Sequence, residues 1–348
     1  MEINFKEGAL KNLIVHYVGN KNNPGDFQTS KEELKPEGEL LKIVGESFLN
    51  KFKDCHDYYS FHHATSLQYN EVYNYVSQLF GKTGSLEDVS LAIATHLYNC
   101  SVHPKVKGGE LYIGVFENLP VEGRMYKAIG LFKAENKSLF LKTDYADKQF
   151  TLQMQEGMEL TKMDKGCLIL NTKQEEGFDV LLFDNQNRGE EAQYWKETFL
   201  GLTPQKNEFH QTNHFLTLTK QFITDQGDNE SGLAKKEQIE LLHKSIDYFR
   251  SNDSFDINNF QQEVFGEDDL IDSFRNFGSR YTEQHDFDIA TQFDISAQAV
   301  KKQMRIYKSV LKLDRNFHIY IHGNTDLIEK GVDLDGRKYY KLYYQDEA

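Results

Sequence analysis

The middle of the chain consists of short apolar or alternating runs that are separated by turn residues. Strict alternation is typical of strands with one buried face, and short continuous apolar runs are typical of strands that are buried on both faces. The runs between residues 108 and 187 are ELYIGVF, RMYKAIGLFKA, SLFLKTDY, CLILNT and FDVLLFD. They predict successive strands of an antiparallel, meandering sheet, and LKNLIVHYV at residues 10–18 predicts an earlier strand.

Helical spacing of apolar residues flanks this strand-rich segment on both sides. Residues 37–53 have that spacing, and Ser85 followed by Asp88 predicts a helix start of the capping-box type. Residues 190–200 (EEAQYWKETFL) return to helical spacing, with acidic residues in the first turn and Gly201 just beyond the end. The polar segment that follows predicts a domain boundary near residues 202–212.

The chain carries a strong acidic excess between Asp225 and Asp294, and beyond this boundary the pattern predicts polar helices. They are FLTLTKQFITD, KKEQIELLHKSIDYFR, INNFQQEVFG and DDLIDSFRNFGSRYTEQ. A more basic helix is predicted over residues 297–313, after Ser296. The final runs FHIYIHG, LIEKGVD and RKYYKLYYQ predict a three-strand meander with turns at Gly323–Asn324 and Asp335–Gly336.

The predicted fold class is therefore α+β, in two domains. Residues 1–204 form an α+β domain with an antiparallel meandering sheet and helices. Residues 205–348 form a helical region in which the acidic helices are followed by the basic helix and the terminal β-meander. A chain of 348 residues that is 39% hydrophobic and 13% aromatic can bury cores in both domains.

Composition also bears on where the protein works. The N-terminal segment has scattered charges and no apolar core of a signal peptide, and no run reaches the ~18 apolar residues of a membrane span. We therefore expect a cytoplasmic protein that does not contact the membrane. Cys55, Cys100 and Cys167 are widely spaced and odd in number, so we expect reduced thiols rather than a disulfide framework.

A net charge of −14 restricts any contact with nucleic acid to a local basic patch. Proteins bind phosphates largely through Lys and Arg, which displace counterions. If residues 297–313 are helical, Val300, Met304, Tyr307 and Leu311 form an apolar stripe and a basic stripe runs beside it. The candidate DNA-binding residues are Lys301, Lys302, Arg305, Lys308, Lys312 and Arg315. The alternatives are a solvated face and a face that pairs with the acidic helices.

The terminal strand is a second basic and aromatic candidate. Alternation places Lys338 and Tyr340 on one face, and Tyr339, Lys341 and Tyr343 on the other. Tyrosines in this arrangement could stack on single-stranded bases, although strand tyrosines more often serve packing.

Fragments that resemble enzyme motifs each lack a required partner. FGKTGS at residues 80–85 lacks the first glycine of a phosphate-binding loop, and HQTNH at residues 210–214 lacks the glutamate of a zinc protease. The Cys and His residues of DCHDYYSFHH, together with Cys100 and His103, match no known zinc spacing. We therefore expect no catalytic residues, no metal and no cofactor.

Five segments, in order and spacing across nearly the whole chain, resemble the bacterial nucleoid-associated protein family typified by NdpA. They are GGELYIGVFENL, AIGLFKAENK, CLILNTKQEEGFDVLLFDNQ, AQYWKETFLGL and VKKQMRIYKSVLKLDRNFHIYIHG. The chain departs from the family pattern in a longer loop around residues 18–36 and in an acidic charge balance.

The resemblance implies a DNA-binding protein that is located at the nucleoid. The expected function is largely sequence-independent binding of double-stranded DNA, with RNA as an alternative ligand and without catalysis. Two other classes remain open. The first is a protein-interaction adaptor whose acidic helices dock a basic partner, and the second is a cryptic nuclease or other enzyme.

Overall fold

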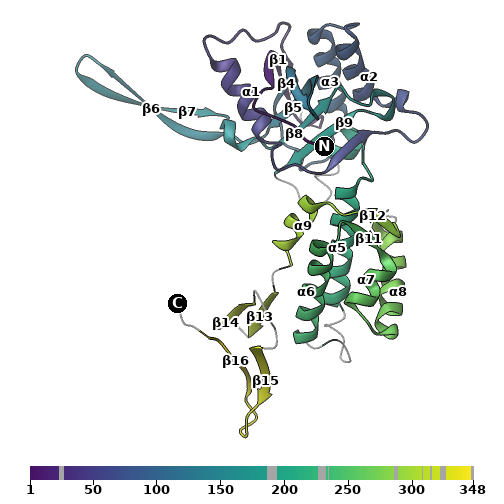
Figure 1. Ribbon diagram of the computed structural model, residues 1–348. Helices are drawn as coiled ribbons and strands as arrows, with labels where there is room; N and C mark the ends of the chain where they lie inside the picture. Colours follow the sequence, from purple (N-terminus) through teal and green to yellow (C-terminus); the bar gives the residue numbers. More distant parts are fainter. Residues whose placement is uncertain are drawn as a thin grey trace. The chain divides into compact units, whose positions relative to one another are not determined.

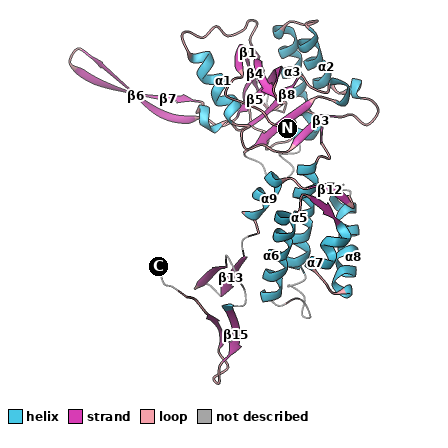
Figure 2. Cartoon of the chain, viewed as in Figure 1, coloured by secondary structure: helices cyan, strands magenta, loops and turns pink. Residues whose placement is uncertain are grey.

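The computed structural model describes residues 1–22, 27–185, 194–225, 233, 235–285, 289–307, 309–313, 316–321 and 327–345. The chain divides into two compact units, Met1–Gln205 and Lys206–Ala348 (Figure 1). The first unit combines a sheet with helices, and the second is mainly helical (Figure 2). The mixed α+β class that the sequence predicts is therefore confirmed.

An eight-stranded sheet organises the first unit, in the order β10-β3-β9-β8-β5-β4-β1-β2. Every neighbouring pair is antiparallel, as the sequence predicts. The strands are β1 (Ala9–Val18), β2 (Phe27–Thr29), β3 (Tyr58–Phe61), β4 (Gly109–Val121), β5 (Arg124–Ala134), β8 (Lys165–Leu170), β9 (Asp179–Asp184) and β10 (Leu202–Pro204). Short helical turns connect them: η1 (Leu67–Tyr69), η2 (Leu160–Lys162), η3 (Gln174–Glu176) and the π-helical η4 (Tyr194–Phe199).

Helices cover both faces of this sheet, which explains why its central strands lack alternation. Along β5, Ile129 lies in one hydrophobic cluster with α2 (Glu71–Gly81) and α3 (Leu86–Cys100). Phe132 of the same strand lies in a second cluster with α1 (Leu40–Asn50). All six residues of β8 are buried, because both of its faces are covered.

The starts of α2 and α3 are determined by side-chain caps. Ser85 Oγ accepts the backbone N–H of Asp88 at 3.1 Å, which confirms the predicted helix start. Asn70 caps α2 by accepting the N–H of Tyr73 at 2.9 Å. The amide of Asn70 also donates to the carbonyl oxygens of His62 (3.1 Å) and Leu200 (2.9 Å). One side chain thus joins the start of a helix to two segments distant in sequence.

A hairpin leaves the sheet between β5 and β8, which pair with each other. Its strands β6 (Ser138–Ala146) and β7 (Gln149–Gly157) form a separate two-stranded sheet that extends away from the rest of the unit (Figure 1). The prediction placed β6 correctly as a strand and assigned no strand to residues 149–157. It also placed β6 in the meander, whereas the structure excludes β6 from the main sheet.

Helices enclose an aromatic core in the second unit. The helices are α5 (Glu208–Asp225), α6 (Lys235–Ser251), α7 (Ile257–Val264), α8 (Asp268–His285) and α9 (Ala297–Met304), and β11 (Ser254–Asp256) pairs with β12 (Gln292–Asp294). Phe215 is central, with its ring centroid 4.3 Å from that of Phe255 and 5.0 Å from that of Phe260. The four predicted polar helices are confirmed, and α5 begins seven residues before the predicted segment, which starts at Phe215.

The end of the chain differs from the prediction in two ways. Residues 297–313 are not one helix, because α9 ends at Met304 and residues 309–313 form a strand. The terminal strands form two hairpins rather than a three-strand meander: β13 (Ser309–Leu313) pairs with β14 (Phe317–Ile321), and β15 (Ile328–Val332) pairs with β16 (Lys338–Leu342). The predicted turn at Asp335–Gly336 is present, with Gly336 at φ +79°, and the turn at Gly323–Asn324 lies outside the described residues.

Of the predicted helix over residues 190–200, the structure describes residues 194–200. Residues 194–199 form the π-helical turn η4, with Tyr194, Trp195 and Phe199 buried, and residues 190–193 lie outside the described part of the chain.

Candidate nucleic-acid interface

Helix α9 is attached to α5 by its buried face. Ser296 caps the helix by accepting the N–H of Ala299 at 3.4 Å. Gln303 is buried, and its amide donates to Asn213 Oδ1 at 2.8 Å and to Thr217 Oγ1 at 3.0 Å. These bonds satisfy a polar side chain that would otherwise be costly to bury, and they hold α9 in one orientation on α5.

Two contacts anchor the chain where α9 ends. The hydroxyl of the buried Tyr307 donates to the carbonyl oxygen of Leu216, and burial raises the pKa of Tyr307 well above its usual value. Lys220 Nζ donates to the carbonyl oxygen of Ile306 at 2.8 Å, and burial lowers the pKa of this lysine. These contacts hold the residues that follow the end of α9 at Met304 against α5.

The outward face of α9 carries three cations. Lys301, Lys302 and Arg305 are exposed, and Lys302 Nζ lies 5.2 Å from the centroid of the Phe209 ring. Among the described residues, Lys301 and Arg305 form no ion pair with a carboxylate. Because these two residues are four positions apart, they lie on the same side of the helix.

The apolar stripe predicted for this helix is partly wrong. Val300 and Tyr307 are buried as predicted, but Met304 is 42% exposed, and Gln303 takes the buried position instead. Of the other half of the predicted basic stripe, Lys312 lies in β13 rather than in a helix, and Lys308 and Arg315 lie outside the described residues. The structure thus brings together Lys301, Lys302 and Arg305 of the six candidates.

The hairpin β15–β16 carries the second basic and aromatic surface. Tyr340 and Ile328 pack with Ile319 against the buried Ile239 of α6. The other face bears Lys341, which lies 3.9 Å from Glu329 and 4.9 Å from the centroid of the Tyr343 ring.

Lys341 is charged at neutral pH. A hydrogen bond with Tyr343 and the nearby charge of Glu329 raise the pKa of Lys341 above its usual value. The ring of Tyr339 lies across Gly331 on the paired strand, where a Cβ atom would come within 2.3 Å of the ring carbon Cζ. This packing fixes a partly exposed tyrosine next to lysines.

A histidine and a serine that resemble a catalytic pair belong to a buried structural network. His16 Nδ1 accepts the N–H of Ser30 at 3.2 Å, so the proton lies on Nε2, which donates to Ser90 Oγ at 2.9 Å. The Ser90 hydroxyl in turn donates to the carbonyl oxygen of Glu87 at 3.0 Å. His16 therefore cannot accept the proton of Ser90 here, and the contact joins β1 to α3.

The zinc-like fragments do not converge on a site. No group of three or more His, Cys, Asp or Glu side chains in the described part of the chain could hold a metal ion. Cys55 Sγ contacts the carbonyl oxygens of Lys51 (3.7 Å) and Leu182 (3.6 Å). His210 and His214 share one face of α5, with ring centroids 4.2 Å apart. In FGKTGS, Gly81 ends α2, and the fragment does not connect a strand to a helix as a phosphate-binding loop does.

Sequence reasoning missed a buried charge cluster at the ends of β5 and β8. Lys133 and Lys165 are fully buried, and both contact Glu135, which is 3% exposed, at 3.3 and 3.0 Å. Burial lowers the pKa of Lys133. Tyr194 donates to Glu135 at 3.3 Å. The available signal was a lysine within each of the two apolar runs GLFKA and KGCLIL.

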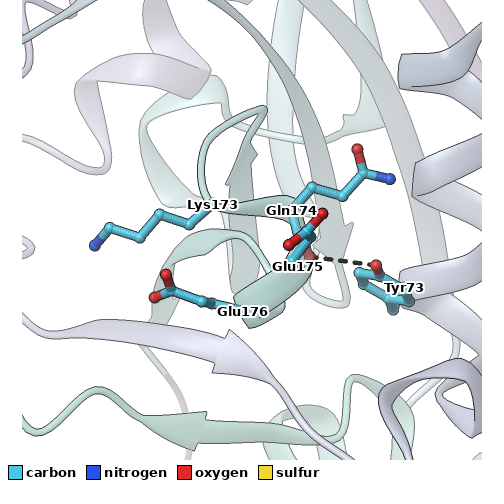
Figure 3. Close-up of a pocket in the computed structure, with 5 residues that line it drawn as sticks. All are labelled: Tyr73, Lys173, Gln174, Glu175 and Glu176. Carbon is cyan, nitrogen blue, oxygen red and sulfur yellow. Dashed lines mark hydrogen bonds between the residues drawn. The ribbon is translucent and has the colours of Figure 1, made fainter.

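An open hollow beside α2 is acidic at its rim. It is lined by Tyr73, Lys173, Gln174, Glu175 and Glu176, and the Tyr73 hydroxyl donates to the carbonyl oxygen of Gln174 at 3.2 Å (Figure 3). Lys173 pairs with Asp179 at 3.2 Å. The two glutamates and the paired lysine make this hollow a poor site for a phosphate group.

No helix in the described ranges is both long and apolar enough to cross a membrane. A search of curated proteins found no match to the chain. The model of the NA37 family, described as nucleoid-associated protein YejK, matches residues 14–335, which is most of the chain. The protein therefore belongs to the family of the nucleoid-associated protein YejK.

Proposed function

We propose that this protein binds double-stranded DNA through exposed cations of its second unit, without altering the DNA chemically. Membership of a nucleoid-associated family supports a role at the nucleoid. The observation that carries the proposal is the outward face of α9, where Lys301 and Arg305 are exposed without a described carboxylate partner. Such cations form a local basic patch that an external anion can reach, as the net charge of −14 requires of any DNA contact.

The chemistry of this face favours phosphates over bases. Lys301, Lys302 and Arg305 supply positive charge, whereas the exposed Gln298 is the only residue with an amide on this face of α9. Contacts made by cations to phosphates position a protein on DNA and carry no sequence information. Binding should therefore be nearly independent of sequence. The lysines of β15–β16 add a second cationic surface, with Tyr339 and Tyr343 beside them.

Fluorescence anisotropy with two labelled duplexes of unrelated sequence tests the proposal. We expect similar affinities for both, with log K falling linearly against log salt at a slope of about −0.9 per phosphate contact. A slope of log K against log salt that corresponds to about three phosphate contacts would match Lys301, Lys302 and Arg305. A duplex RNA of the same length serves as the alternative ligand. Absence of binding to any of these at about 50 mM salt would contradict the proposal.

The adaptor hypothesis would then take precedence. Its candidate surface is the acidic first turn of α8, Asp268 and Asp269, together with Asp272. The adaptor hypothesis would be supported if the protein bound basic proteins through these carboxylates and bound no DNA.

A further inference from the structure

The β6–β7 hairpin, which we call the arm, is joined to no other strand in the described part of the chain. Its register runs from Ser138 opposite Gly157 to Ala146 opposite Gln149. The turn residues Asp147 and Lys148 both have positive φ, as in the two-residue turns that match the twist of paired strands. An isolated two-stranded hairpin is at best marginally stable in water, so an arm of this length needs further contacts.

The arm has one apolar and one polar face. Cross-strand partners share a face, and successive residues alternate between faces. The apolar face also includes Thr143 and Glu156, and its six large side chains are 62–71% exposed: Leu139, Leu141, Tyr145, Phe150, Leu152 and Met154. The opposite face is mainly polar, with Phe140 at its base as its one large apolar residue; its polar residues are Lys142, Asp144, Gln149, Thr151, Gln153 and Gln155. The strict alternation of residues 150–155 is typical of a strand with one covered face, yet the described chain leaves this face open.

The apolar face is large enough for a specific interface. Six large side chains that are each about two-thirds exposed present on the order of 800 Å², close to the ~800 Å² per partner of a standard protein–protein interface. The largest apolar patch on a typical monomer is only roughly 300–600 Å². The ends of the face are also defined, with the Tyr145 and Phe150 rings 4.6 Å apart at the tip and Leu139 at the base.

We propose that the apolar face of the arm packs against the same face of a second copy of this chain. The face complements itself because its charge is confined to Glu156 at the base, so a two-fold arrangement brings no like charges together at the centre. Two such ribbons pack face to face at about 10 Å and bury both apolar faces, while both polar faces stay in water.

Charge argues against DNA as the occupant of the arm. Its acidic residues Asp144, Asp147 and Glu156 outnumber Lys142 and Lys148, and Lys142 is paired with Asp144 at 3.2 Å. The proposal is thus independent of the DNA-binding proposal, whose residues lie in the other unit.

A pair of matched double variants tests the proposal. Leu152→Glu/Met154→Lys places two opposite charges on the apolar face. Thr151→Glu/Gln153→Lys places the same two charges one residue earlier, on the polar face of the same strand. By light scattering and sedimentation equilibrium we expect the wild type and the polar-face variant to dimerise alike, within about twofold in Kd. We expect the apolar-face variant to have a Kd at least ~10-fold higher, because charged groups would have to be buried.

A cross-linking measurement locates the contact. Thr143→Cys places a thiol in the middle of the apolar face, and Asp144→Cys places one on the polar face. A short bis-maleimide should join two copies of the first variant and not of the second. The wild type, which has only Cys55, Cys100 and Cys167, gives the background level of cross-linking. Unchanged circular dichroism shows that the variants are folded. The proposal would be overturned if the wild type stayed monomeric at protein concentrations far above those of the DNA-binding experiment. It would also be overturned if both double variants dimerised equally. Binding of the monomer to lipid vesicles through the same face would replace it.

Discussion

Lys165 and Glu135 form an ion pair that is shielded from water, with 3.0 Å between Nζ and Oε2. Lys133 contacts the other carboxylate oxygen at 3.3 Å and also donates to the carbonyl oxygen of Lys107 at 2.7 Å. Glu135 therefore contacts both buried lysines at the ends of neighbouring strands β5 and β8, and Asp184 lies 3.8 Å from Lys165. Removal of one partner from such a group leaves a buried charge uncompensated, which costs more than the pair contributes.

Glu135→Gln should destabilise the first unit strongly. The change keeps the size of the side chain and removes the charge that faces both lysines. We expect a loss of about 3–5 kcal/mol in the free energy of unfolding, measured with urea. Glu117→Gln is the matched control, since Glu117 pairs with Lys127 at 2.9 Å on the surface. An exposed pair contributes little, so the control should unfold like the wild type. Equal effects of the two substitutions would show that the buried glutamate has no special role.

His16 should make stability depend on pH in the weakly acidic range. Burial lowers the pKa of His16 below 6.5, so the folded state binds a proton less readily than the unfolded state. Its contribution to stability is complete above about pH 6.5 and is lost as the pH falls through the lower pKa of the folded protein. His16→Asn should be less stable than the wild type at pH 7.5, with a difference that narrows towards pH 5. A constant difference across this range would contradict the assignment of a neutral imidazole.

Asn70→Ala should weaken the attachment of α2. The substitution removes the N-cap and leaves the buried carbonyl oxygen of Leu200 without its 2.9 Å donor. We expect a loss of about 1–3 kcal/mol in thermal or urea unfolding. Asn74→Ala, one turn later in α2, removes only an exposed bond to Gln68 and serves as control. If both variants unfold alike, the contacts of Asn70 outside the helix contribute nothing measurable.

The longer sheet strands β1, β4, β5, β8 and β9 and the polar helices of the second unit could be predicted because local pattern and tertiary structure agree, whereas the short strands β2, β3 and β10 were not predicted. The runs of β4, β5, β8 and β9 are bounded by turn residues, and each is buried as its pattern indicates. Residues 149–157 were missed although Phe150, Leu152 and Met154 alternate with polar residues. The segment is polar overall, and its apolar residues are exposed within a single chain. A second copy of the chain, as proposed, would give this alternating pattern a buried face.

The basic stripe could be predicted only in part because residues 300–313 satisfy two periodicities. Val300 and Tyr307 fit a helix, whereas VLKL at residues 310–313 fits alternation about as well. Contacts with α5 favour the helix only as far as its observed end. Gln303 donates to Asn213, and Tyr307 donates to the carbonyl oxygen of Leu216. These partners lie about 90 residues earlier in the chain, so no local pattern could reveal them.

The two cationic surfaces should contribute differently to DNA binding, and two charge-reversal variants separate them. Lys301→Glu/Arg305→Glu reverses the two exposed cations of α9 that have no described carboxylate partner. We expect it to weaken binding of every duplex alike and to reduce the salt slope by about 1.8, or about 0.9 for each lost contact. Lys338→Glu/Lys341→Glu makes the same charge change on β16. Lys341 is already opposite Glu329, so this variant should lose less affinity and less slope. Both changes are exposed, and each should shift stability by no more than about 0.5 kcal/mol. If the β16 variant loses more affinity than the α9 variant while both remain folded, the terminal hairpin is the principal DNA contact and the assignment to α9 is wrong.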